Sequence, residues 1–498
     1  MRATLLSTWG ALFLSLGVIA ADSWPVSTFQ TGPWQPPQLN INKTDGAEEG
    51  MIFIPIRNSN RAGTAVTIYD ADGNFVYQGP EETTMDFKMQ TLFGENVITY
   101  WSGEADQYAG YGYGQVHILD QTYKEIYTIS LTGDFVTTDN ETKDSYIDVH
   151  EHIITDRNTI IVSAANVTQY DLTAAGGQPD QWIVASQFYE IDVKTNKVLY
   201  SWNVLDQEAQ IPLSESKMPI QSGVSQTSPW DGYHMNAVQA TNGGFIVSFR
   251  HLWSAFYLNQ NGTVRWQLSG ANDGSGNFTG DDLRFSWQHH VRVYNETDES
   301  LVLSLFNNAN SATDSESETT GMVFELDLVG HKGSMLYNLS DPADPIYTKT
   351  QGSFQFLGAA GTTANMFMGY GSACMLKEYS AQGDVVTSAE FGALGHAESY
   401  RAFKNQWTAT PYWSPAVVTN GTGGSVNVYM SWNGATEYDN WQVYSVPSMD
   451  SNTTTKLTNV ARSGFETNAI LNTSSVHYIK VAAQKGTSVL GWSDTVQL

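Results

Sequence analysis

Three histidines and one arginine are the side chains of this sequence whose types and spacing most strongly suggest chemistry. His150, His234 and His289 each stand at the start of a short predicted strand, in three segments of similar pattern. Imidazole takes up and releases protons near neutral pH, so histidines that meet in one place can act as acid and base. Arg250, at the end of the strand predicted over 244–250, offers a planar fork of donors suited to sulfate or to two adjacent carbonyl oxygens.

The equivalent placement of the three histidines decides between a structural and a chemical role. A single histidine is more often a half-buried group with satisfied hydrogen bonds than a catalytic one. Three at the same position of a repeated pattern are expected to converge, which favours a shared site. The corresponding segments elsewhere lack the histidine, so a non-catalytic propeller that binds one ligand in each repeat is the less favoured alternative.

One hairpin pattern recurs along the chain and must position these residues. Each copy has an alternating apolar run, a polar turn and a second alternating run, at intervals of roughly 50 to 70 residues. The copies read AVTIYDADGNFVYQG, QVHILDQTYKEIYTI, FYEIDVKTNKVLYSW, AFYLNQNGTVRWQL, MVFELDLVGHKGSMLY and CMLKEYSAQGDVVTSA. Another strand pair precedes each hairpin, which makes one four-stranded blade per repeat. We therefore predict an all-β protein with a six-bladed β-propeller over residues 21–420, its inner strand pairs carrying the histidines.

The chain after about residue 420 has a different sequence pattern. Its short predicted strands have separate turns and lack the histidine pattern, as in VNVYMSWNGATEYDNWQVYSV and HYIKVAAQKGTSVLGWSD. We predict a small β-sandwich of the fibronectin or immunoglobulin kind over residues 421–498. A seventh blade is the alternative.

The beginning of the chain predicts export. Residues 1–20 combine Arg2, an apolar run and a small-residue end, which is typical of a secretory signal peptide, and no later run is apolar enough for a membrane span. We expect a protein that is secreted or held in the lumen of the secretory pathway. Ten glycosylation sequons fit this route: Asn42, Asn140, Asn166, Asn261, Asn277, Asn295, Asn338, Asn420, Asn452 and Asn472.

Charge and cysteine content exclude several classes of partner and site. The formal net charge is -27, with 24 basic and 51 acidic residues and no basic cluster, so we expect neither nucleic acid nor a membrane as partner. Cys374 is the single cysteine, which excludes an internal disulfide. Stability must therefore come from a large apolar core. The oligomeric state is left open.

Several segments together resemble a known family. They include DVHEHIITDRNTIIVSAANV, WDGYHMNAVQATNGGFIVSFRH, FSWQHHVRV with LSLFNNA, and YMSWNGATEYDNW with GFET. In their order along nearly the whole chain they resemble the fungal branch of the arylsulfotransferase-like (ASST) β-propeller family. The resemblance implies the same propeller fold.

The resemblance also implies roles for individual residues. In bacterial members of that family, sulfate passes from an aryl sulfate to a phenol through a sulfated histidine. Two further histidines, an asparagine and an arginine help this transfer. Matched by motif, His289 resembles the sulfated residue, His150 the first helping histidine, His234 with Asn236 the HxN pair, and Arg250 the arginine.

This sequence departs from the family pattern beside the site. The fungal branch commonly has the motif QHD, where this chain has Gln288-His289-His290, so a histidine replaces the aspartate. It commonly has RHT, where this chain has Arg250-His251-Leu252, followed by Trp253. Loss of a carboxylate would leave His289 less oriented and less basic, and Trp253 would narrow the site if it faced the channel. Both changes weaken the inference of sulfate transfer.

Relatives in the fungal branch include the hetero-Diels–Alderases of tropolonic sesquiterpene biosynthesis. These join a tropolone-derived o-quinone methide to a humulene-type alkene, so the resemblance implies aromatic and terpenoid small molecules as partners. Tyr233, Trp253 and Trp287, with Asn236, are the candidate substrate-binding residues around the histidines. We expect a biosynthetic cyclase of secondary metabolism, with aryl sulfate sulfotransfer as the alternative.

Such a cyclase needs no cofactor and no metal, and the sequence contains no nucleotide fingerprint or metal-spaced cluster. His150 and His152 alternate with Glu151, so we expect both imidazoles on one face of a strand. No third ligand follows at metal-site spacing. An open zinc site built from the three convergent histidines is the remaining alternative.

Overall fold

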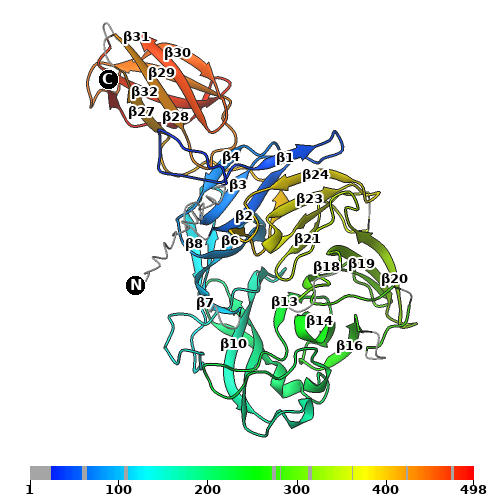
Figure 1. Cartoon of the computed structure of the whole chain (residues 1–498). Coiled ribbons are helices and arrows are strands. Elements are labelled where there is room, and N and C mark those ends of the chain that lie inside the picture. Colours follow the sequence, from blue (N-terminus) through cyan, green and yellow to red (C-terminus); the bar gives the residue numbers. More distant parts are fainter. Residues whose placement is uncertain are drawn as a thin grey trace, which may run out of the picture.

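The structure is a computed structural model of the 498-residue chain. It describes residues 24–58, 64–105, 110–271, 276–280, 282–311, 317–361, 363–421, 424–472 and 476–498, so the predicted signal peptide 1–20 lies outside the described residues. Within these ranges six antiparallel sheets follow one another around a ring (Figure 1). The predicted six-bladed β-propeller is thereby confirmed.

Four blades are built from consecutive strands, ordered along the chain from one edge of each sheet to the other. The first two are β5 (Thr84–Leu92), β6 (Glu95–Ala105), β7 (Gly112–Leu119), β8 (Glu125–Ile129), and β9 (His152–Ile154), β10 (Thr159–Tyr170), β11 (Gln181–Asp192), β12 (Val198–Asn203). The next two are β13 (Met235–Ala240), β14 (Gly244–Phe249), β15 (Ser254–Asn259), β16 (Val264–Ser269), and β17 (His289–Tyr294), β18 (Ser300–Asn307), β19 (Thr320–Asp327), β20 (Lys332–Leu339).

The remaining two blades combine the beginning of the propeller with its end. The fifth is β21 (Ser353–Phe356), β22 (Met366–Gly369), β23 (Met375–Tyr379) and β24 (Val385–Glu390), extended by β1 (Asn40–Lys43). In the sixth, β2 (Met51–Asn58), β3 (Ala65–Tyr69) and β4 (Phe75–Gln78) are completed by β25 (Ala397–Glu398) and β26 (Phe403–Asn405), which both pair with β2. This pairing closes the ring and leaves no open inner edge.

The six predicted hairpins are the outer strand pairs, β3–β4, β7–β8, β11–β12, β15–β16, β19–β20 and β23–β24. Their polar turns form because short side chains bond the backbone of the turn itself. Oδ1 of Asp70, for example, accepts the N–H groups of Asp72 and Asn74, each at 2.9 Å. Turn chemistry visible in the sequence therefore sets these elements.

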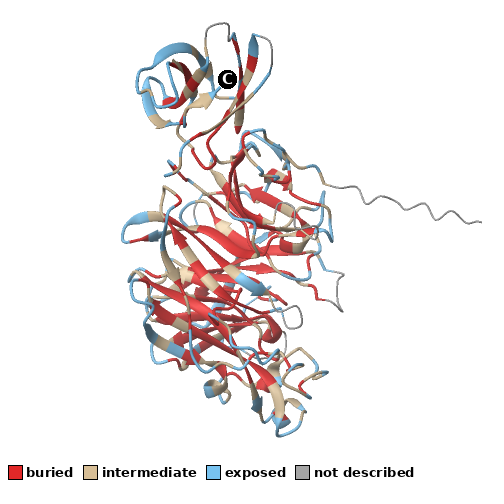
Figure 2. Cartoon of the chain, turned by 90° about the vertical axis from the view of Figure 1, so that its left-hand side faces the viewer, coloured by how far each residue is buried: buried red, intermediate tan, exposed pale blue. Residues whose placement is uncertain are grey.

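The apolar core lies between neighbouring blades. One cluster packs Ile161 and Phe188 of the second blade against Val247 and Phe256 of the third, and comparable clusters fill the other gaps. Figure 2 shows the strands as mostly buried and the connecting loops as exposed. Inner strands covered on both faces, such as β14, are buried throughout, whereas outer strands such as β20 alternate between buried and exposed residues.

Three inner strands carry an irregularity that turns side chains toward the channel. Asp86, His234 and His290 all have a positive φ, of 52°, 55° and 52°. In β5, β13 and β17 the pairing register shifts by a bulge at or beside these residues. Bulges commonly re-aim side chains next to functional sites, and a positive φ is costly for these residue types.

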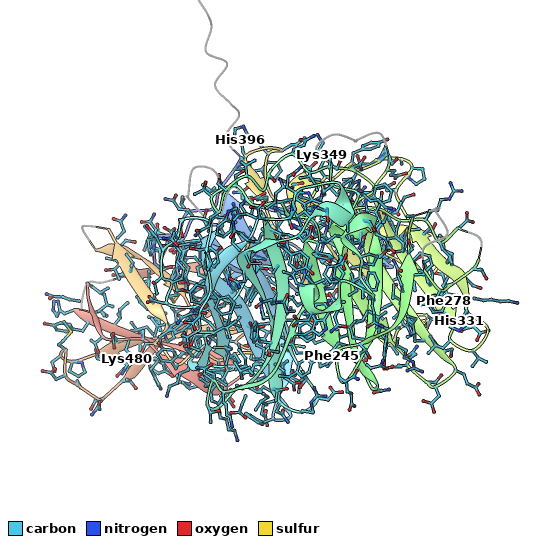
Figure 3. All side chains as sticks on the ribbon, turned by 90° about the horizontal axis from the view of Figure 1, so that it is seen from below. Phe245, Phe278, His331, Lys349, His396 and Lys480 are labelled. Carbon is cyan, nitrogen blue, oxygen red and sulfur yellow. The ribbon has the colours of Figure 1, made fainter. Side chains whose placement is uncertain are left out.

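The end of the chain forms a two-sheet sandwich beside the propeller (Figures 1 and 3). One sheet holds β27 (Ala416–Asn420), β28 (Ser425–Ser431) and β31 (Glu466–Asn472); the other holds β29 (Asn440–Val446), β30 (Thr455–Ala461), β32 (Tyr478–Lys485), β33 (Ser488–Trp492) and β34 (Val496–Gln497). A core around Trp441 and Val481 lies between them. The strands do not form a seventh blade, and the first begins before residue 421.

The sequons lie on the surface of the described chain. Nine of the ten asparagines are exposed, whereas Asn166 is half-buried and its Oδ1 accepts the N–H of Val136 at 2.8 Å. Their glycosylation remains a prediction. The described helices are the five 3₁₀ turns η1 (Thr173–Ala175), η2 (Val204–Gln207), η3 (Leu213–Glu215), η4 (Arg250–Leu252) and η5 (Gly371–Ala373), and none is long or apolar enough to cross a membrane.

Candidate active site

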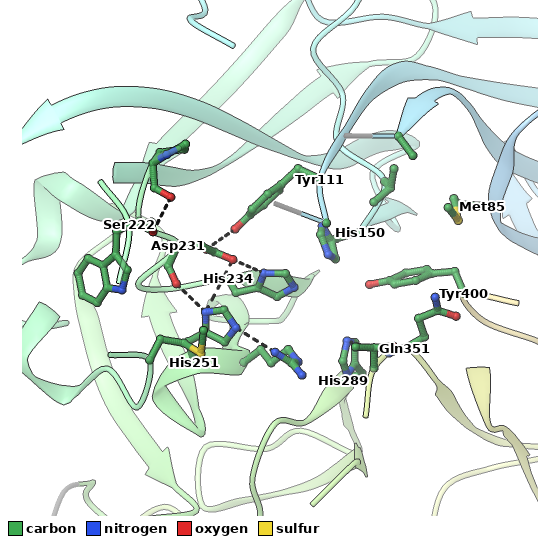
Figure 4. A pocket seen from close by; sticks show the side chains of 18 of the residues that line it. Met85, Tyr111, His150, Ser222, Asp231, His234, His251, His289, Gln351 and Tyr400 are labelled. Carbon is green, nitrogen blue, oxygen red and sulfur yellow. Dashed lines mark hydrogen bonds and ion pairs between the residues drawn. The ribbon is translucent and has the colours of Figure 1, made fainter. Parts of the chain in front are cut away.

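A cavity of about 780 Å³ opens at the end of the channel where the inner strands begin. His150 and His234 precede β9 and β13, and His289 is the first residue of β17. All three line this cavity (Figure 4). Arg250 lines it as well. The structure thus brings together the four residues that the sequence analysis singled out. Arg250 lies in η4, one residue beyond the end of β14, and not in the predicted strand.

Two of the histidines are each held by a carboxylate. Nδ1 of His150 lies 2.6 Å from Oδ2 of Asp148, and Nδ1 of His234 lies 2.6 Å from Oδ2 of Asp231. A carboxylate on Nδ1 fixes the proton there, orients the ring and stabilises the imidazolium that forms when Nε2 takes a second proton. In each ring Nε2 has no hydrogen-bond partner among the described residues, so it is available to a substrate.

The rings of these two dyads meet edge to face. The centroids of His150 and His234 are 4.8 Å apart, and the ring of Tyr111 lies 5.2 Å and 5.3 Å from them. The Tyr111 hydroxyl donates to the second oxygen of Asp231 at 2.8 Å, which holds that carboxylate in place. Burial lowers the pKa of His234 below its ordinary value of 6.5, and the nearby Asp231 carboxylate opposes this shift.

His289 is oriented by an amide. Its Nδ1 donates to Oδ1 of Asn308 at 2.6 Å, and the Asn308 amide group donates to the carbonyls of Thr348 and Gln351, which fixes that amide's orientation. On the other side of the ring, Nε2 accepts the backbone N–H of Gln351 at 3.2 Å. Burial, reinforced by the positive charge of Arg250, lowers the pKa of His289 well below 6.5. The imidazole is therefore neutral.

His290 does not replace the missing carboxylate beside His289. Its ring packs against Phe403 with centroids 5.4 Å apart, and its Nδ1 accepts the N–H of Phe354 at 3.3 Å. At the bulge in β17 the regular alternation is interrupted, and His290 borders a separate, smaller cavity instead of the one that His289 lines. The expectation that His289 is poorly oriented is therefore wrong. Asn308, just after the end of β18, supplies the acceptor that fixes the His289 ring.

Arg250 is largely engaged by the protein. One guanidinium nitrogen lies 2.9 Å from Nε2 of His251, another donates to the carbonyl of Lys349 at 2.7 Å, and the group lies 5.1 Å above the ring of Trp287. Burial lowers its pKa to about 10, so it stays charged at neutral pH. Its charge faces the cavity, where it favours an oxygen atom that carries negative charge.

Tyr400 places a hydroxyl without a partner in the same cavity. Its ring lies 5.6 Å from that of His150 and 6.4 Å from that of His289, and it is 5 % exposed. No described residue forms a hydrogen bond with its hydroxyl. A buried hydroxyl left unpaired costs about 1–3 kcal/mol, so its retention needs an explanation. A substrate oxygen is the partner that the position of the hydroxyl suggests.

A layer of buried charges closes the cavity below the histidines. The Glu151 carboxylate accepts from Lys88, Arg292 and Arg401 at 3.2, 2.7 and 3.0 Å. Asp86 accepts from Lys88 at 2.6 Å and from Arg401 at 3.1 Å. The cations hold the pKa of Asp86 below its usual value and that of Glu151 well below, although burial opposes both shifts. The layer joins strands from four blades across the channel.

Four predicted substrate-binding residues lie outside the cavity wall. Tyr233 is buried in the core and its hydroxyl donates to the carbonyl of Ile211 at 3.0 Å, and Asn236 donates to the carbonyl of Gln288 at 2.7 Å. Trp253 borders a different surface cavity, and Trp287 lies behind Arg250 and His251. A position near a histidine in the sequence did not predict that a side chain faces the cavity, because Tyr233, Trp253 and Trp287 lie in connecting segments whose course the sequence pattern does not specify.

Other residues replace them. Asp148 and Asp231 stand two and three positions before their histidines, so the motifs DVH and DGYH contained a readable signal. His251 directly follows Arg250 in η4. Tyr111, Asn308, Gln351 and Tyr400 come from loops or strand ends outside the motifs of the predicted site residues and carried no comparable signal.

The structure separates His150 from His152. Because β9 begins at His152, the expected alternation does not extend to His150, and His152 lies in the charged layer with Nε2 3.0 Å from Thr99. One group of potential metal ligands occurs among the described residues, Asp231, His234 and His251, with ligand atoms within 4.8 Å of one another. Nδ1 of each histidine bonds Asp231, and the charge of Arg250 on Nε2 of His251 disfavours a cation there.

Comparisons with known proteins show the family. Among solved structures the chain is similar to the α-L-arabinanase of Penicillium chrysogenum (11% identity, 86% of this chain and 99% of that one, TM-score 0.32) and an α-L-arabinofuranosidase of Fusarium graminearum (10% identity, 87% and 99%, TM-score 0.33). No curated protein matches the sequence. The family model described as Arylsulfotransferase (ASST) matches residues 88–392, more than half of the chain. This protein belongs to the arylsulfotransferase (ASST) family.

Proposed function

We propose that this protein is an enzyme that acts on an aromatic, oxygen-bearing small molecule by proton transfer, and that its reaction is a hetero-Diels–Alder-type cyclisation. The observation that carries the proposal is the meeting of two carboxylate-held imidazoles, His150 and His234, at 4.8 Å in one cavity. Two such groups side by side suit a reaction that removes one proton and delivers another.

The first step generates the reactive heterodiene. One imidazole Nε2 takes the proton of the ring hydroxyl of a hydroxymethyl tropolone, and the other, as imidazolium, gives a proton to the leaving hydroxyl. The carbon–oxygen bond of the hydroxymethyl group breaks, water leaves, and an o-quinone methide remains. His234 suits the role of base because its pKa is lowered, so the neutral form prevails at neutral pH. One proton moves in each direction, and no net charge is created.

The second step is the cycloaddition. The alkene of a humulene-type partner adds across the heterodiene, forming one carbon–carbon and one carbon–oxygen bond without further proton transfer. The Tyr400 hydroxyl donates to the conjugated oxygen, and the charge of Arg250 adds to the polarisation. Apolar wall residues Met85, Val149 and Trp230 hold the two partners together and limit the water that would quench the intermediate.

A product assay tests the proposal. The purified full chain is incubated with a hydroxymethyl tropolone and humulenol, and the yield and enantiomeric excess of the adduct are compared with those of the uncatalysed mixture. We expect faster formation of one enantiomer, a loss of at least ~100-fold in His150→Gln and His234→Gln, and no loss in the exposed-site control His396→Gln. A racemic product at the uncatalysed rate would overturn the proposal.

Sulfate transfer is the second candidate, because of the family and the placement of His289. Its Nδ1 is held by Asn308, so Nε2 is the atom that would take a sulfuryl group from an aryl sulfate and pass it to a phenol. The Gln351 N–H on Nε2 must then give way. Turnover of nitrophenyl sulfate with phenol that disappears in His289→Ala would support this candidate; no turnover with several donors would remove it.

A further inference from the structure

A second, smaller cavity lies below the charged layer, at the opposite end of the channel from the candidate active site. Its volume is about 200 Å³. The inner strands run from the upper cavity toward it: β5 passes from Met85 to Lys88, and β17 from His289 to Arg292. The charged layer separates the two cavities.

The wall of this lower cavity contains basic groups and no carboxylate. Lys88, His290 and Arg292 border it, along with uncharged residues: Met89, Gln90, Ile153, Tyr294, Phe354, Gln355, Phe403 and Asn405. Four other cavities of the described chain, including the candidate active site, are each bordered by at least one Asp or Glu. The local potential therefore favours a negative ligand.

His290 borders this space and has a donor without a partner among the described residues. Because Nδ1 accepts the backbone N–H of Phe354, the proton of the neutral ring sits on Nε2. Burial, followed by the charges of Arg292 and Arg401, lowers the pKa of His290 well below 6.5, so the ring is neutral. No described residue accepts the Nε2 proton. His290 is 4 % exposed, and a buried donor of this kind needs an acceptor.

The charged layer leaves Lys88 and Arg292 with capacity for another partner. The layer has three cations, Lys88, Arg292 and Arg401, against two carboxylates, Asp86 and Glu151, a surplus of one positive charge. Lys88 uses two of its three ammonium donors on these carboxylates. Arg292 gives one nitrogen to Glu151 and one to the carbonyl of Val291, so further N–H groups remain.

We propose that this lower cavity binds a small anion, an inorganic oxyanion or a short carboxylate, between Lys88, His290 and Arg292. One negative charge there balances the surplus of the layer and accepts the Nε2 proton of His290. Buried charges that lack a counter-ion are costly, so the anion also stabilises the closed ring where strands of four blades meet. The aromatic rings of Phe354 and Phe403 leave room for a short apolar tail on a carboxylate.

Titration calorimetry at constant ionic strength tests the site, with sodium sulfate, phosphate and acetate as probes on the intact protein. We expect saturable binding of at least one of these anions. In His290→Phe, which keeps a ring against Phe403 but removes the donor, the affinity should fall ~10-fold or more, and Lys88→Met should show the same loss. The control Arg157→Gln, in a surface cavity where Arg157 pairs with Glu190, should bind as the wild type does.

The candidate active site also contains an arginine that could bind an anion, so the variant Arg250→Gln shows which of the two cavities the anion occupies. Binding that survives in Arg250→Gln and is weakened in His290→Phe supports the proposal. Binding that is lost in Arg250→Gln and unchanged in His290→Phe places the anion in the candidate active site and overturns it. No saturable binding of any of the three anions by the wild type means that water occupies the cavity, and this also overturns it.

Discussion

The side-chain oxygen of Asn308 lies 2.6 Å from Nδ1 of His289 and accepts its proton, whereas His150 and His234 donate to carboxylates at the same distance. An amide orients an imidazole as a carboxylate does, but it does not stabilise the positive charge that appears when the ring takes a proton. Two imidazoles of the cavity are therefore paired with a carboxylate and one with an amide, while a fourth, His251, bonds a backbone carbonyl through Nδ1. This difference separates the two candidate reactions.

Replacing His289 by glutamine should distinguish cyclisation from sulfate transfer. Glutamine retains a polar group near Asn308 but has no nucleophilic nitrogen. For the cyclase we expect His289→Gln to keep turnover within ~10-fold of the wild type, because proton transfer rests on the other two histidines. For sulfate transfer the same variant should show no turnover. Rates of both reactions measured on one preparation check this, and loss of cyclisation to the level of His234→Gln would contradict the assignment of roles.

Tyr400→Phe should lower activity without lowering stability. The variant removes a buried hydroxyl that no described residue satisfies, so the free energy of unfolding should stay unchanged or rise, by up to about 1–3 kcal/mol. Loss of a donor to the substrate oxygen should reduce kcat by roughly 10- to 1,000-fold. Urea unfolding and steady-state kinetics measure the two effects.

The matched control for that variant is Tyr233→Phe. Its hydroxyl donates to the carbonyl of Ile211 in the core and does not face the cavity. Here stability should fall by about 1 kcal/mol while kcat per folded molecule stays the same. If both tyrosine variants lost activity equally, a specific role for Tyr400 would be untenable.

Acid should destabilise the protein through its buried histidines. Burial lowers the pKa of His152 and of His251 to about 3 in the folded state, against an ordinary value of 6.5. Between these values the unfolded chain binds protons that the folded chain does not. The stabilisation is therefore complete above pH 6.5 and is lost as pH falls toward 3, by up to ~1.4 kcal/mol per pH unit for each histidine.

Unfolding midpoints measured from pH 7.5 down to pH 4.5 check this slope. His152→Gln should flatten it by removing one titrating group, whereas the exposed His396→Gln should leave it as in the wild type. A stability that is constant over this range would show that the buried histidines take up protons in the folded state.

The sandwich should be held to the propeller by an aromatic contact. Phe465, which follows β30 and is 5 % exposed, lies 4.5 Å from the ring of Phe29 and 4.4 Å from that of Phe75 in β4. Phe465→Ala should lower stability by about 3–5 kcal/mol and raise the rate of proteolysis between propeller and sandwich. The exposed Tyr412→Ala is the control, and equal effects of the two would mean that this contact does not hold the sandwich.

The sequence by itself determined the repeating part of the fold. Six hairpins with polar turns and alternating apolar residues can bury their apolar faces only by packing against one another, and this requirement gives blades and a ring. It also identified His150, His234, Arg250 and His289, because equivalent places in equivalent blades lie at one end of the channel. Asp148 and Asp231 were not predicted, although each stands within three positions of the histidine that it holds.

Only the tertiary structure decided which other side chains complete the site. Asn308, Tyr400 and Tyr111 reach the cavity from loops and strand ends whose course no periodic pattern specifies. Tyr233 and Trp253 stand beside site residues in the sequence but point elsewhere, because both lie in the segments that connect strands, where no regular alternation sets the direction of a side chain. Closure of the ring places Arg401, from near the end of the propeller, against Asp86, from near its beginning, and so creates the charged layer that separates the two cavities.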